Sequence, residues 1–134
     1  MSPMEPETVE LKTSEDIVRA RQRVRTCMID HGFGLIDQTK MVTAASELAR
    51  NTIDYGKGGT MRIESITDSG RTGMRLVFLD KGPGIKDIQQ ALKDGFTTGQ
   101  GLGLGLGGSK RLVNDFEIWS EPDKGTKVTI TRWR

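Results

Sequence analysis

Apolar residues recur at helical spacing in two stretches of the first half of the chain. The first stretch follows a good helix cap at Ser14 and ends at His31-Gly32, where glycine favours a helix terminus. Its apolar stripe consists of Ile17, Ala20, Val24, Cys27 and Met28. This spacing predicts one helix with a single buried face.

The second helical stretch is predicted to begin after a cap at Asp37 and to run to about Tyr55, with 33–36 as the connector. Its apolar stripe consists of Met41, Ala45, Leu48 and Thr52, with Val42, Ala49 and Ile53 beside it. Both helices therefore have one face suited to packing against a sheet.

Alternating apolar and polar positions indicate strands in the rest of the chain. The expected strands are Thr8–Thr13, Met61–Thr67, Met74–Asp80, Phe116–Ser120 and Lys127–Trp133. Connecting segments are expected at 68–73 and 121–126. A short helix is expected over Ile85–Leu92, and another from Gly103 or Leu104 to Asn114. This order predicts an α/β sandwich with helices on one face of the sheet.

Length and composition narrow the possible classes of function. The 134 residues suit one domain, which we place at 7–134 after a flexible leader at 1–6. A net charge of only +2, with no basic run, argues against nucleic acid as a partner. No apolar run approaches the ~20 residues of a membrane span. The single cysteine, Cys27, suits a reducing cytoplasm.

The second predicted helix carries two polar side chains that could take part in catalysis or metal binding. Glu47 and Asn51 are four residues apart and therefore share one helix face. A carboxylate and an amide in this arrangement suit a general base and a magnesium ligand. An exposed polar helix face would have the same pattern, so the pair alone leaves both interpretations open.

A second group follows the strand that ends at Asp80. A carboxylate there can accept a hydrogen bond from an exocyclic amine such as that of adenine, and Gly82 and Gly84 would let a ligand approach the backbone. The hydroxyl of Thr126, between the last two strands, could complete such a site. An ordinary turn also favours Asp, Gly and Pro, so this motif alone is not decisive.

Glycines alternate with leucines just before the last predicted helix. Gly101, Gly103, Gly105 and Gly107 provide successive backbone N–H groups ahead of a helix N-terminus, an arrangement that binds phosphate oxygens. A dinucleotide-binding motif would need a preceding strand, which the polar residues 97–101 do not supply. A P-loop would need Gly-Lys-Ser/Thr, whereas residues 108–110 read Gly-Ser-Lys.

Taken in order, these signals resemble the N, G1, G2 and G3 boxes of the GHKL ATP-binding superfamily. Within it, the chain is most similar to the serine/threonine switch kinases of the bacterial stressosome and to anti-sigma-factor kinases. The segments that carry the resemblance are Asp16–Arg21, Gly32–Gly34, Ser46–Asn51, Asp80–Ile85, Asp94–Phe96 and Lys110–Leu112. The resemblance implies the Bergerat fold, an α/β sandwich with a mixed, mostly antiparallel sheet covered on one face by helices.

The resemblance also implies roles for individual residues. Glu47 would be the general base, Asn51 the Mg²⁺ ligand, and Asp80 with Thr126 the adenine-reading pair. The alternating glycines would form a lid over the phosphates of ATP. The implied substrates are STAS-domain proteins, namely the stressosome scaffold and antagonist. The implied second partner is a PP2C-type phosphatase regulator.

One departure from the family pattern concerns the cation at the terminal phosphate. Residues 96–109 contain no Lys or Arg, whereas anti-sigma kinases often place a basic residue in this region. Phosphoryl transfer normally uses a cation besides magnesium. Lys110 and Arg111 are the nearest candidates, although both also suit a solvated helix surface.

Other functions fit parts of the same pattern. A non-catalytic, nucleotide-dependent binding module of anti-sigma or phosphatase-activating type would have no need of Glu47. A sensor histidine kinase fragment would need a phosphoacceptor histidine, but His31 suits a helix end. A gyrase-like or Hsp90-like ATPase would need further domains. The sequence therefore favours a protein serine/threonine kinase.

Overall fold

The computed structural model describes residues 5–85 and 106–134, and every structural statement below refers to these residues. The elements are β1 (Glu7–Leu11), α1 (Ser14–Asp30), α2 (Leu35–Asp54), β2 (Gly59–Asp68), β3 (Arg71–Asp80), α4 (Leu106–Arg111), β4 (Asp115–Glu121) and β5 (Gly125–Trp133). The predicted helix after Ile85 and the glycines at 101, 103 and 105 lie outside the described residues.

The five strands form one sheet in the order β1-β2-β3-β5-β4, and every pairing among them is antiparallel. The central strand β3 therefore lies between β2 and β5. In this register Asp80, the last residue of β3, is opposite Gly59 on one side and Thr126 on the other.

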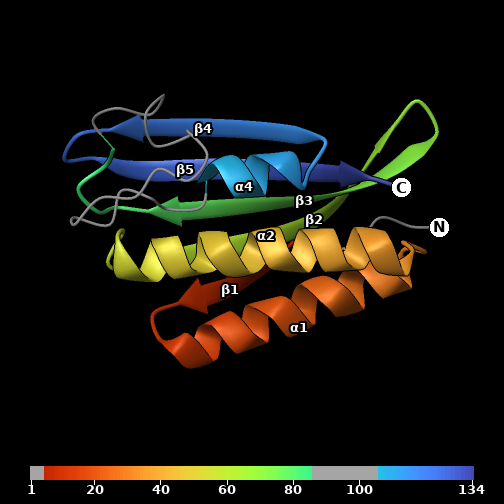
Figure 1. The fold of residues 1–134 in the computed structure, drawn as a ribbon, viewed down its shortest axis with the longest axis horizontal. Coiled ribbons are helices and arrows are strands. Elements are labelled where there is room, and N and C mark those ends of the chain that lie inside the picture. Colours follow the sequence, from red (N-terminus) through yellow and green to blue (C-terminus); the bar gives the residue numbers. More distant parts are fainter. Residues whose placement is uncertain (1–4, 86–105) are drawn as a thin grey trace.

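Helices α1, α2 and α4 lie on the same face of the sheet (Figure 1). Alternate strand residues point toward these helices and are buried, as the alternation predicts for a sheet covered on one side. The largest of them, each no more than 2% exposed, are Leu11, Met61, Ile63, Met74, Leu76, Phe78 and Ile130. The predicted α/β sandwich, with a mostly antiparallel sheet and helices on one face, is confirmed.

The start of α1 differs slightly from the prediction. Strand β1 ends at Leu11, and Thr13 rather than Ser14 is the N-cap. The carboxylate of Asp16 accepts hydrogen bonds from the backbone N–H groups of Lys12 (2.8 Å) and Thr13 (3.0 Å). These bonds fix the entry of the chain into the helix, because a side chain at the third helical position satisfies free N–H donors there.

Helix α2 begins at Leu35, two residues before the predicted cap at Asp37. Gly34 is the N-cap, and its carbonyl accepts the N–H of Gln38 at 3.0 Å. Asp37 lies in the first turn, where it pairs with Arg132 of β5 at 2.7 Å. The carboxylate therefore joins the helix to the sheet instead of capping it.

The β2–β3 turn and helix α4 are both shorter than predicted. The β2–β3 turn consists of Ser69 and Gly70 alone, both at positive φ, as a tight type I′ hairpin turn requires. Helix α4 ends at Arg111 rather than Asn114. Asn114 instead pairs with the sheet, because its N–H donates to the carbonyl of Thr131 and its side-chain oxygen accepts the N–H of Trp133.

Two leucines of β3 test which face of the sheet holds the core. Leu76 is fully buried, whereas Leu79 is 42% exposed. Replacing Leu76 with alanine leaves a cavity and should lower the free energy of unfolding by about 2–5 kcal/mol. Leu79→Ala is the matched control and should cost less than ~1 kcal/mol. Chemical denaturation of both variants measures the difference, and equal losses would contradict the assigned faces.

Candidate functional site

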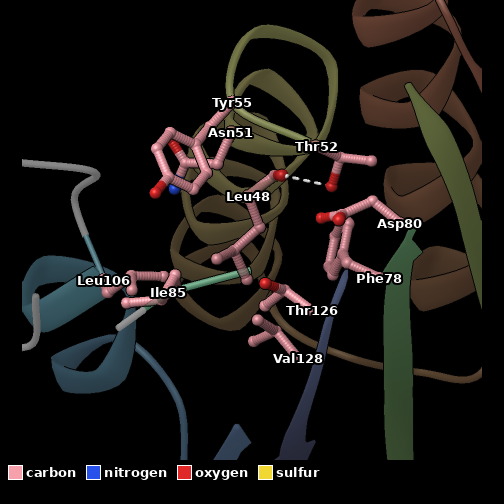
Figure 2. A pocket seen from close by; sticks show the side chains of 10 residues that line it. All are labelled: Leu48, Asn51, Thr52, Tyr55, Phe78, Asp80, Ile85, Leu106, Thr126 and Val128. Atoms are coloured by element: carbon pink, nitrogen blue, oxygen red, sulfur yellow. Dashed lines mark hydrogen bonds between the residues drawn. The ribbon is translucent and has the colours of Figure 1, made fainter. Parts of the chain in front are cut away.

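A pocket lies between the C-terminal half of α2 and the end of the sheet at which β3 ends and β5 begins. Figure 2 shows its side chains, which come from these elements, from α4 and from the segment after β3. The lining residues are Leu48, Asn51, Thr52, Tyr55, Phe78, Asp80, Ile85, Leu106, Thr126 and Val128. The lining is mainly apolar with a few polar groups, which is typical of a small-molecule site.

Asp80 supplies the carboxylate of this pocket and is only 9% exposed. Its Oδ1 accepts the N–H of Gly82 at 2.9 Å, and the backbone N–H of Thr126 also hydrogen-bonds to the carboxylate. Burial raises the pKa of Asp80, while these two hydrogen bonds oppose the rise. No ion pair with Asp80 occurs among the described residues. A hydrogen-bond donor on a ligand would therefore find a poorly compensated acceptor here.

The close packing around Asp80 depends on Gly56, which directly follows α2. A Cβ at residue 56 would overlap the carboxylate of Asp80. Gly82 packs against the same residue, because a Cβ there would lie 2.7 Å from the carbonyl oxygen of Gly56. The role of Gly56 was not predicted from the sequence.

A pair of hydroxyls lies beside the carboxylate. The side-chain oxygens of Ser120 and Thr126 are 2.8 Å apart, and Ser120 also donates to the carbonyl of Gly125. Ser120 in turn accepts the N–H of Ile85 at 2.7 Å. The predicted meeting of Thr126 with Asp80 is confirmed by the strand register. Ser120, which comes from the neighbouring strand β4, was not predicted as a site residue.

Tyr55 closes the pocket on the helix side. Its hydroxyl donates to the carbonyl of Gly84 at 3.1 Å, which ties the end of α2 to the turn after β3. Gly84 has φ +76°, and a Cβ there would overlap the carbonyl oxygen of Glu121. Internal packing thus accounts for glycine at this position without any ligand. Tyr55 is four residues after Asn51, so helical spacing could have identified it as a pocket residue.

The remaining predicted site residues are more dispersed. Asn51 lines the pocket, but Glu47, one turn earlier on α2, is exposed and does not line it. Lys110 is exposed on α4. Gly107, expected in the glycine lid, lies buried within helix α4. The structure therefore brings together Asn51, Asp80 and Thr126, while Glu47 lies outside the cavity.

The pocket is almost filled by its own side chains. The free volume between them is about 20 Å³, which is room for about one water molecule. Ile85 and Leu106 are 4% and 2% exposed and contribute to this filling. A planar ring of the size of adenine can enter only when some of these side chains move.

Two further features bear on the class of site. Among residues 5–85 and 106–134, no group of three or more His, Cys, Asp or Glu side chains could hold a metal ion. No helix in the same part of the chain is long and apolar enough to cross a membrane.

Residues 36–133 match the family of histidine kinase-, DNA gyrase B- and HSP90-like ATPases. The chain therefore belongs to this family of ATP-binding domains, and the predicted GHKL class is confirmed. The pocket lies within the matched segment, so the buried carboxylate and its neighbours are part of an ATP-binding fold.

Similarity to individual proteins narrows the class further. The chain is 43% identical over 125 residues to the serine/threonine-protein kinase RsbT of Bacillus subtilis, and the match covers 93% of this chain and 94% of the relative. It is 29% identical to the anti-sigma F factor of Clostridium beijerinckii, with 96% and 92% of the two chains covered. The chain is thus an ATP-dependent protein kinase similar to RsbT, as its motifs predicted.

The fold also matches a solved structure. A Mycobacterium tuberculosis protein with RsbU and RsbW domains superposes with a TM-score of 0.65 at 19% sequence identity. The match covers 98% of this chain but only 33% of the mycobacterial chain. At this level of identity the likeness concerns the fold alone.

The substitution Asp80→Asn should separate ligand binding from stability. The amide can turn a donor toward the ligand amine, and an unpaired buried polar group costs about 1–3 kcal/mol, or roughly 5–150-fold in the Kd for ATP. Calorimetry should show this loss. Unchanged ATP affinity would contradict the role given to Asp80.

The same variant should not be less stable than the parent protein near neutral pH. A raised pKa means that the ionised Asp80 carboxyl destabilises the folded state once the pH exceeds its folded pKa. Asparagine removes this cost, and its advantage should shrink as the pH falls toward the ordinary aspartate pKa of 3.8. Denaturation across this pH range tests the sign, and a growing advantage at low pH would contradict it.

Gly56→Ala should disable the pocket, because the added methyl group must displace the carboxylate of Asp80. We expect at least a tenfold weaker Kd for ATP, measured by calorimetry. Gly34→Ala is the matched control, since a Cβ at 34 meets nothing within 4 Å. Equal ATP affinity of both variants would show that the carboxylate position does not matter.

Proposed function

We propose that the pocket binds the adenine of Mg-ATP and that the chain transfers the terminal phosphate to a serine or threonine of a folded partner protein. The observation that carries this proposal is the buried carboxylate of Asp80 beside the hydroxyl of Thr126. In an apolar pocket, such an acceptor suits the exocyclic amine of adenine.

Asn51 is the residue best placed to hold magnesium. Its amide is partly exposed at the pocket, and Mg²⁺ commonly takes one or two protein oxygens and completes its shell with phosphates and water. A single amide oxygen therefore fits the group. When bound, the ion would neutralise charge on the phosphates. Lys110 is the exposed cation that we propose for the terminal phosphate.

Glu47 is proposed as the general base. It is exposed on α2, one helical turn from Asn51 and outside the adenine pocket. A hydroxyl that approaches from solvent can therefore reach its carboxylate, which would accept the proton as the oxygen attacks the phosphate. Residues 5–85 and 106–134 form one five-stranded sheet with its covering helices and no second lobe, so we infer that the partner itself delivers the hydroxyl.

The similarity to RsbT supports a particular kind of partner. We propose that the substrates are STAS-domain proteins, the scaffold and antagonist of a stressosome, and that the released kinase binds and activates a PP2C-type phosphatase regulator. A cytoplasmic setting belongs to the same proposal and is consistent with the buried free thiol of Cys27. A purely nucleotide-dependent binding module is the alternative that the next experiment addresses.

Glu47→Gln keeps the size of the side chain and removes the base. Binding of ATP should be unchanged by calorimetry, because Glu47 does not line the pocket. Transfer of radiolabel from ATP to the STAS-domain protein of the same organism should fall by about 10²–10⁴-fold.

The matched control is Glu117→Gln, which removes an exposed carboxylate on strand β4. It should transfer phosphate at the parental rate. A Glu47→Gln enzyme as fast as this control would remove Glu47 from the mechanism. A parental chain that binds ATP but labels no STAS protein would favour the binding module.

A further inference from the structure

A groove separate from the ATP pocket runs between helices α1 and α2. It is lined by Val18, Arg21, Gln22 and Arg25 of α1 and by Val42 of α2. Its volume is about 260 Å³, more than ten times the free volume of the ATP pocket. Val42 is 4% exposed and forms an apolar floor. None of these residues lines the ATP pocket.

The arginines of α1 divide into two sets. Arg19 pairs with Asp16 at 2.6 Å, and Arg23 makes two hydrogen bonds with Glu7 at 2.7 and 2.9 Å. Arg21 and Arg25 make no ion pair with any residue in 5–85 or 106–134. The two arginines of α1 without an ion pair among the described residues therefore both line the groove.

Arg25 is held in place by a neutral partner. Its guanidinium donates to the side-chain oxygen of Gln38 at 3.2 Å, and the amide nitrogen of Gln38 donates to the carbonyl of Phe33 at 2.9 Å. Gln38 is only 9% exposed, so its amide is fixed by these contacts. Because glutamine carries no charge, Arg25 is positioned without being neutralised.

Apolar side chains lie on the same face of α1 as these charges. Val18 and Ile29 are 53% and 55% exposed. Together with Gln22 and Arg25 they follow the spacing i, i+4, i+7, i+11, which places all four on one helix face. At 1.5 Å per residue, this face is about 16 Å long, or about three helical turns.

We propose that this groove is the docking site for an acidic, amphipathic helix of a partner protein. Apolar residues of that helix would cover Val18 and Val42, and its Asp or Glu residues would pair with Arg21 and Arg25. The two arginines complement the acidic side chains of such a helix, and the apolar floor at Val42 favours a helix over a nucleic acid, whose phosphates offer no apolar surface. The proposal rests on the proposed function only for the identity of the partner, because the groove is separate from the ATP pocket.

The test uses Arg21→Glu and Arg25→Glu in the full chain, with Lys127→Glu as the matched charge reversal on β5, outside the groove. Calorimetry measures the Kd for the purified STAS-domain protein and for the PP2C-type regulator of the same organism. We expect both groove variants to bind at least one of them about tenfold or more weakly. ATP affinity should stay within about twofold, and thermal unfolding checks that the variants are folded.

A synthetic acidic amphipathic helix of 18 residues, with leucines at i, i+4, i+7 and i+11, tests the groove independently of the proposed partner proteins. Amide shifts of α1 and α2 on its addition, abolished by Arg21→Glu, would support the groove even if neither protein bound. Unchanged binding by both variants, or an equal loss with Lys127→Glu, would overturn the proposal. If the two groove variants lost binding only to a 20-base-pair DNA duplex, and not to either protein or the peptide, the proposal would be overturned in favour of nucleic acid.

Discussion

The burial of one carboxylate, that of Asp80, is the constraint on which the site depends. The group is removed from water at the end of the central strand, and within residues 5–85 and 106–134 its compensation comes from the backbone N–H groups of Gly82 and Thr126. This arrangement requires a residue without a side chain at Gly56 and a strand, β5, that presents Thr126 beside the carboxylate. The turn after α2 and the order of the strands are therefore both needed to accommodate this carboxylate. The carboxylate can in turn accept a hydrogen bond from a ligand.

Much of the fold could be predicted because its cause is local periodicity. The apolar stripes of the two long helices and the alternation in the strands predicted a sheet with helices on one face. The apolar run before Asp80 predicted that its carboxylate lies at the end of a strand. Ser120 and Gly56 could not be predicted, because their roles arise from contacts with Ile85 and Asp80 across the fold. The cap predicted at Asp37 was wrong because the distant Arg132 binds that carboxylate.

The proposed mechanism places nucleotide recognition and substrate delivery at separate positions on the chain. The adenine pocket is narrow and nearly filled, whereas Glu47 is exposed to solvent outside it. Under the proposed function, the partner protein brings the acceptor hydroxyl to Glu47. The basic groove between α1 and α2 would hold that partner by a surface that the nucleotide does not share, so that docking and catalysis can be altered independently.

The most direct measurement of the central claim compares ATP with purine riboside triphosphate, which lacks the exocyclic amine, and with GTP. Calorimetry on the parental chain in the presence of Mg²⁺ gives the three dissociation constants. If the Asp80 carboxylate accepts a hydrogen bond from the amine, ATP should bind roughly 5–150-fold more tightly than either analogue, since an unmet buried acceptor costs about 1–3 kcal/mol. Equal affinity for all three nucleotides would contradict the role of Asp80 in reading adenine.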